Sequence, residues 1–163
     1  MYCKNPESRY VSPHRKEGNV DTPDTDHETS PKAPVILVDD SLMDTTIARR
    51  VYERSKLDNP LLVFHNGNDL LRYLDGVESG DKPRPALVFL DVHLEGKTGV
   101  ETLSAVRSRH RFRSRPNIIM LTNEDDPQVA EASLAQGADG YQLKPAKPPD
   151  FIRFFNSLEE LVE

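Results

Sequence analysis

The sequence is poor in cysteine, in long apolar runs and in net positive charge. Its one cysteine, Cys3, cannot form a disulfide bond within the chain. Since no run of about 18 apolar residues is present, no segment qualifies as a membrane-spanning helix. The polar start of the chain also lacks the apolar segment of a secretory signal, so we expect a cytoplasmic protein.

The charge balance is acidic, with 27 Asp and Glu against 21 Lys and Arg and a net charge of −6. A protein that binds nucleic acid non-specifically would instead carry a basic stripe. We therefore expect no nucleic-acid partner. The length of 163 residues suits one domain.

Two parts of the chain differ in composition. Residues 1–33 are rich in Pro, Ser, Thr and Asp and show no apolar period that could bury a face, which predicts a disordered tail. Residues 34–163 alternate between strand and helix patterns. The strand runs are 35–39, 61–65, 86–91, 117–121 and 140–144, and the helical patterns are 41–56, 69–77, 99–109, 127–136 and 148–162.

This alternation predicts a doubly wound α/β fold, a parallel sheet with helices on both faces. Three of the strand runs are almost continuously apolar, as expected for strands covered on both sides. The carboxyl ends of such strands meet at one edge of the sheet, where open α/β folds bind their ligands. The first strand ends in Asp39 and Asp40, the third in Asp91, the fourth in Thr122 and the fifth in Lys144.

Three carboxylates at one edge repel one another unless a cation lies among them. Their oxygen atoms suit Mg²⁺, which usually takes one or two protein carboxylates and completes its shell with water and phosphate oxygens. Lys144 and Thr122 could then bind an anion next to the metal. A phosphoryl group on one carboxylate would engage the metal, the ammonium and the hydroxyl together.

In these motifs the chain resembles the receiver domains of two-component response regulators. The matching segments are "VILVDDS", "VFLDVHLEGKTGVE", "IIMLTNED" and "GYQLKP". The resemblance implies a flavodoxin-like sheet of order 2-1-3-4-5. It also implies a phosphoacceptor that takes its phosphoryl group from a sensor histidine kinase or a histidine phosphotransfer protein and catalyses its own phosphorylation and dephosphorylation, without being a classical enzyme.

The resemblance also assigns roles. Asp91 would become the 4-aspartylphosphate, and Lys144 would pair with the phosphoryl group. Asp40, Asp91 and the backbone carbonyl of His93 would bind Mg²⁺ directly, with Asp39 acting through water.

Two further implications concern the response to phosphorylation. Thr122 and Tyr141 would form the switch, in which the hydroxyl moves toward the phosphoryl group and the ring turns inward. The Lys144–Pro145 bond would be cis, an isomer that X-Pro bonds tolerate.

Some positions depart from the usual family pattern. Glu95 stands where proline is usual, and Asn123 stands where the residue after the switch threonine is usually small. His93 and Glu124 occupy positions that tune hydrolysis of the acyl phosphate in this family, so the rate stays open. Gly99 matches the glycine that follows the phosphoacceptor loop.

The segment "DGVESGDKPRPALVFLD" resembles that of single-domain regulators paired with phytochrome-type kinases. The last helical pattern ends with the sequence, so we expect output through protein contacts. Two alternatives stay open, a receiver-like scaffold that is not phosphorylated and an aspartyl-nucleophile phosphohydrolase. The phosphohydrolases usually carry a second Asp two residues after the nucleophile, where this chain has His93. An acidic pair after a strand can also be a simple helix cap.

The last helical pattern has a wide apolar arc. At 100° per residue its core-facing stripe consists of Phe151, Phe155, Leu158 and Val162. Ile152 on one side of that stripe, and Phe154 and Leu161 on the other, widen the arc to about 180°, more than one buried face needs. In the receivers that the chain resembles, the last helix shares a face with the fourth helix and the fifth strand. We therefore expect a homodimer through that face, unless neighbouring helices or the tail cover the excess.

Overall fold

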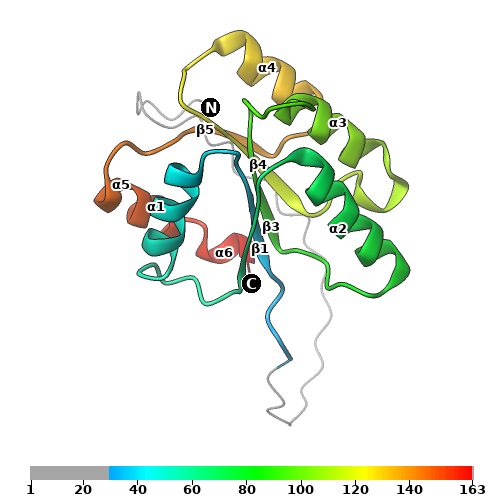
Figure 1. The fold of residues 1–163 in the computed structure, drawn as a ribbon, viewed down its shortest axis with the longest axis horizontal. Coiled ribbons are helices and arrows are strands. Elements are labelled where there is room, and N and C mark those ends of the chain that lie inside the picture. Colours follow the sequence, from blue (N-terminus) through cyan, green and yellow to red (C-terminus); the bar gives the residue numbers. More distant parts are fainter. Residues whose placement is uncertain (1–29, 163) are drawn as a thin grey trace.

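The computed structural model describes residues 30–162. Its centre is a five-stranded parallel sheet of order β2-β1-β3-β4-β5. Figure 1 shows this sheet between two layers of helices. This arrangement confirms the predicted doubly wound fold and its strand order. The strands are β1 (Val35–Val38), β2 (Leu61–Phe64), β3 (Leu87–Asp91), β4 (Asn117–Thr122) and β5 (Gly140–Leu143).

Helices cover both faces of the sheet. In Figure 1, α1, α5 and α6 lie on one side of the strands and α2, α3 and α4 on the other. No helix among residues 30–162 is long and apolar enough to cross a membrane. The helices are α1 (Leu42–Tyr52), α2 (Gly67–Ser79), α3 (Gly99–Ser108), α4 (Pro127–Ala135), α5 (Pro148–Asn156) and α6 (Glu159–Val162), with a short 3₁₀ turn at His110–Phe112.

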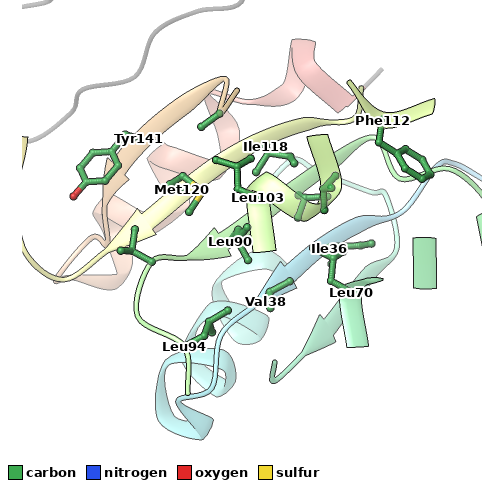
Figure 2. Close-up of a cluster of buried hydrophobic side chains, with 14 of the residues drawn as sticks. Ile36, Val38, Leu70, Leu90, Leu94, Leu103, Phe112, Ile118, Met120 and Tyr141 are labelled. Carbon is green, nitrogen blue, oxygen red and sulfur yellow. The ribbon is translucent and has the colours of Figure 1, made fainter. Parts of the chain in front are cut away.

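Alternate residues of the central strands supply two separate hydrophobic cores. Val35 and Leu37 belong to the core under α1, α5 and α6, whereas Ile36 and Val38 belong to the core under α2, α3 and α4. Figure 2 shows the second core, where Leu70, Leu103 and other helix residues meet the strands. Because both faces are buried, the strands read as unbroken apolar runs.

The final helical pattern differs from the prediction of one helix over 148–162. The structure has two helices, because α5 ends at Asn156 and a turn at Ser157 precedes α6. The Ser157 hydroxyl donates to the Phe154 carbonyl, a local bond that competes with helix continuation. The predicted core stripe of Phe151, Phe155, Leu158 and Val162 is buried all the same.

Some other boundaries also differ. Helix α2 begins at Gly67, before the predicted Asp69, because the Asn66 side chain caps it by accepting from the Asp69 backbone N–H. At the amino end, Lys32 pairs with Asp58 at 2.5 Å, and Asn59 donates to the Ala33 carbonyl at 2.8 Å. The domain's contacts therefore begin before residue 34. Residues 1–29, with Cys3 and most of the predicted tail, lie outside the described part.

Candidate functional site

The carboxyl edge of the sheet brings together the predicted acidic residues and the lysine. Asp39 and Asp91 are almost fully buried, with exposed fractions of 2% and 4%. The Lys144 ammonium lies 2.7 Å from Asp39 Oδ2 and 2.9 Å from Asp91 Oδ2. Residues 105 and 53 positions apart in the chain thus share one ion-pair cluster.

Backbone N–H groups fix the orientation of both buried carboxylates. Asp39 Oδ1 accepts from the Ser41 N–H at 2.9 Å, and Asp91 Oδ1 accepts from the His93 N–H at 3.0 Å. Each carboxylate therefore holds one oxygen against the backbone and points the other at Lys144. The helix cap is Ser41, whose hydroxyl accepts from the Asp44 N–H, so the acidic pair is not merely a cap.

The acidic cluster fits a divalent cation. Asp39, Asp40 and Asp91 each offer a carboxylate oxygen, and these atoms lie within 4.8 Å of one another. Asp40 is less buried than the other two, and its Oδ2 accepts from the Glu95 N–H at 3.1 Å. An all-oxygen donor set open to water on one side matches the preference of Mg²⁺.

Burial and ion pairing act in opposite directions on the titration of this cluster. Burial raises the pKa of Asp39 above its usual value, although hydrogen bonds from Lys144 and Ser41 act to lower it. Burial would lower the pKa of Lys144, but its bonds to Asp39, Asp91 and Asp44 outweigh that effect and raise it. Lys144 is therefore charged throughout the physiological range.

A fourth carboxylate belongs to the site, and the sequence analysis missed it. Asp44 Oδ2 lies 3.0 Å from the Lys144 ammonium. Helical spacing could not identify it, because Asp40 precedes the helix cap Ser41 and α1 begins only at Leu42.

The two predicted switch residues converge on one carbonyl. The Thr122 hydroxyl donates to the Glu124 carbonyl at 3.1 Å, and the Tyr141 hydroxyl donates to the same oxygen at 3.3 Å. The Tyr141 ring lies inside the core of Figure 2, with an exposed fraction of 1%. The two residues are thus connected through the segment that joins β4 to α4.

The loop after β3 packs tightly against the end of β3. A methyl group at Gly99 would lie 2.0 Å from the Asp91 carbonyl oxygen, so only glycine fits there. Thr98 and Glu101 form a capping box that starts α3 immediately after this loop. His93, Asn123 and Glu124, which the sequence analysis singled out, are exposed.

The structure corrects the predicted cis bond. Among residues 30–162 the cis peptide bond is Arg115–Pro116, and Lys144–Pro145 is not cis. The trans form of an X-Pro bond is favoured by only about 0.5–1 kcal/mol, so the sequence does not decide the isomer. Lys144 reaches its three carboxylate partners without the cis bond.

The predicted interface residues are partly covered by the protein itself. Phe154 and Leu161 are half-buried and pack against the core under α1 and α5. The Phe154 ring lies 5.7 Å from that of Phe89 and 5.8 Å from that of Phe155. Part of the surplus apolar surface is therefore used within the domain.

The sequence profile of the family described as "Response regulator receiver domain" matches residues 35–156. The chain belongs to this family. The matched residues run from β1 to the end of α5, and α6 lies beyond them.

Relatives of this receiver domain include both bacterial and plant proteins. Response regulator Rcp1 of Synechocystis is 26% identical over 133 residues, which cover 81% of this chain and 90% of Rcp1. Two-component response regulator ARR5 of Arabidopsis thaliana is 30% identical over 147 residues, which cover 86% of this chain and 78% of ARR5.

Solved structures of receivers have the same fold. The Mn²⁺-bound form of Rcp1 superposes with a TM-score of 0.67 at 26% identity, covering 80% of this chain and 93% of that one. The bacteriophytochrome response regulator RtBRR gives a TM-score of 0.65 at 31% identity and covers 78% of each chain.

Proposed function

We propose that this protein is a single-domain response regulator that accepts a phosphoryl group on Asp91 from a sensor histidine kinase or a histidine phosphotransfer protein. The observation that carries this proposal is the Lys144 ammonium shared by Asp39 and Asp91 in a nearly buried cluster. Such a cation is already in place to neutralise charge that arrives on Asp91.

The reaction follows from the orientation of Asp91. Its Oδ2 forms the new bond to phosphorus, while the bond from phosphorus to the donor's imidazole nitrogen breaks and that nitrogen keeps the electron pair. The His93 N–H holds the other oxygen of Asp91 in place. Thr122 is the hydroxyl that turns from the Glu124 carbonyl to the phosphoryl group, and Tyr141 shares that carbonyl.

The proposal includes Mg²⁺ as cofactor. Asp40, Asp91 and the backbone carbonyl of His93 would hold the ion directly, and Asp39 would hold it through water. When bound, Mg²⁺ supplies positive charge that stabilises the phosphoryl oxygens. The oxygen cluster of Asp39, Asp40 and Asp91 supports this assignment.

Phosphotransfer tests the proposal. Incubation with acetyl phosphate and Mg²⁺, or with phosphorylated histidine kinases, should add one phosphate to the wild type and none to Asp91→Asn. EDTA should abolish the labelling. Labelling of Asp91→Asn at the wild-type level would refute the assignment.

The resemblance to bacteriophytochrome regulators supports a phytochrome-type kinase as the donor. Profiling of transfer rates against several purified kinases would test this, since the cognate donor should transfer fastest. We place this reaction in the cytoplasm and assign no nucleic-acid or membrane partner.

We also infer a homodimer through the face of α4, β5 and α5, with Phe154 and Leu161 in the interface. Leu134 of α4 has an exposed fraction of 39%, and we infer that it takes part in the same interface. Because Phe154 is half-buried, Leu134→Glu is the cleaner test, and Leu134→Gln controls for lost apolar area. Light scattering should show a dimer that Leu134→Glu disrupts, whereas a monomeric wild type with and without beryllofluoride would refute the dimer.

The alternatives receive less support. A scaffold that is not phosphorylated would not need Lys144, Asp39 and Asp91 in mutual contact. A phosphohydrolase needs an acid/base group near Asp91, but the side chain of His93 is exposed and its role in the site is through the backbone. Turnover of small phosphomonoesters would favour the phosphohydrolase.

A further inference from the structure

The proposed reaction gives no role to Asp44, although this residue contacts its central cation. A lysine ammonium has three N–H donors. Asp39, Asp91 and Asp44 accept from it at 2.7, 2.9 and 3.0 Å. The three carboxylates therefore use its full donor capacity.

Asp44 differs from the other two partners in origin and exposure. It comes from the first turn of α1, where its backbone N–H donates to the Ser41 hydroxyl at 3.2 Å. Its side chain is 34% exposed, against 3% for Asp39 and 5% for Asp91. Asp44 is thus a fixed acceptor on the outer side of the ammonium.

We propose that Asp44 is a positioning residue, which together with Asp39 orients Lys144 so that its third N–H is directed at Asp91. This inference rests on the proposed function. In a tetrahedral ammonium, two directed N–H bonds determine the direction of the third. When Asp91 becomes an acyl phosphate, Lys144 keeps Asp39 and Asp44 and transfers only one hydrogen bond to a phosphoryl oxygen.

Geometry and charge can be separated by two substitutions. Asp44→Asn keeps an oxygen acceptor but removes the charge, whereas Asp44→Ala removes both. Orientation of Lys144 needs the acceptor, so we expect Asp44→Asn to be labelled within about twofold of the wild-type rate. We expect Asp44→Ala to be slowed about tenfold, the factor that loss of one charge-assisted hydrogen bond typically gives.

The test measures labelling rates with acetyl phosphate and Mg²⁺ on the full chain. Glu53→Ala is the matched control, because it removes a carboxylate from the other end of α1, away from Lys144. A second readout needs neither phosphate nor metal. The ¹⁵Nζ signal of the Lys144 ammonium should shift and broaden in Asp44→Ala but stay narrow in Asp44→Asn and Glu53→Ala.

The outcomes distinguish this inference from the proposed function. If the wild type is not labelled at all, the proposed function fails. If the wild type is labelled and Asp44→Ala matches it in rate and in the ¹⁵Nζ signal, only the role of Asp44 fails. If Asp44→Asn is as slow as Asp44→Ala, Asp44 acts through its charge, and the positioning role is refuted.

Discussion

Replacing Lys144 with methionine removes the cation from the acidic cluster while keeping a side chain of similar length. The substitution leaves the Asp39 and Asp91 side chains, which are 3% and 5% exposed, without their shared counter-charge. Removal of one partner from a buried ion pair costs about 3–5 kcal/mol. The Asp44 side chain is one-third exposed and stays hydrated, so we expect its lost ion pair to add little to the cost in stability.

Urea unfolding at pH 7 in EDTA measures this cost. We expect the free energy of unfolding of Lys144→Met to fall by about 3–5 kcal/mol. Mg²⁺ should restore part of it, because a ligand at 100 times its dissociation constant stabilises the folded state by about 2.7 kcal/mol. The control Lys32→Met removes an exposed pair with Asp58 and should cost less than about 1 kcal/mol.

The pH dependence of the stability lost in Lys144→Met gives an independent check. Burial already raises the pKa of Asp39 in the wild type, and loss of Lys144 removes the bond that opposes this effect. A raised folded-state pKa favours the protonated form in the folded protein, so stability is lost as pH rises and regained as pH falls. The loss of stability caused by Lys144→Met should therefore shrink as pH falls toward the ordinary Asp pKa of about 3.9. A loss of less than about 1 kcal/mol in the free energy of unfolding, unchanged by Mg²⁺ and by pH, would refute this account of the cluster.

Three other predictions follow from the structure. Asp40→Ala should weaken Mg²⁺ binding more than Asp39→Ala in a tyrosine-fluorescence titration; equal affinity in both variants and the wild type would mean that neither carboxylate binds the ion. Gly99→Ala should destabilise the protein by about 1–3 kcal/mol and slow labelling, because its methyl group overlaps the Asp91 carbonyl; unchanged stability and labelling would contradict that packing. Burial raises the pKa of Tyr52 to about 12 from 10. Stability should therefore fall between pH 10 and 12 by about 2.7 kcal/mol, at about 1.36 kcal/mol per unit, and absorbance at 295 nm should show a late titration step that Tyr52→Phe removes.

The sequence predicts the sheet and the central site because both depend on the ends of strands. Apolar runs that end in Asp39, Asp91 and Lys144 place these groups at one edge whatever the details of the helices. Asp44 could not be assigned in this way, since its contact with Lys144 depends on how α1 lies against the strand edge.

Features set by small energy differences were harder to predict. The isomer of Lys144–Pro145 depends on a preference of about 1 kcal/mol or less. The break at Ser157 accompanies a local hydrogen bond from its hydroxyl to the Phe154 carbonyl. The wide apolar arc assumed one continuous helix, but Phe154 lies in α5 and Leu161 in α6. The partial burial of Phe154 against Phe89 could not be read from helical angles either. Angles show which residues share a face and not how far a neighbouring strand covers them.

Trapping of the acyl phosphate tests the central claim most directly. Borohydride reduces an aspartyl phosphate to homoserine, so treatment after reaction with acetyl phosphate and Mg²⁺ should mark the phosphorylated residue for peptide mass spectrometry. The account predicts homoserine at position 91 in the wild type, and at no position when EDTA is present. Homoserine at Asp39, Asp40 or Asp44, or none at Asp91, would contradict it.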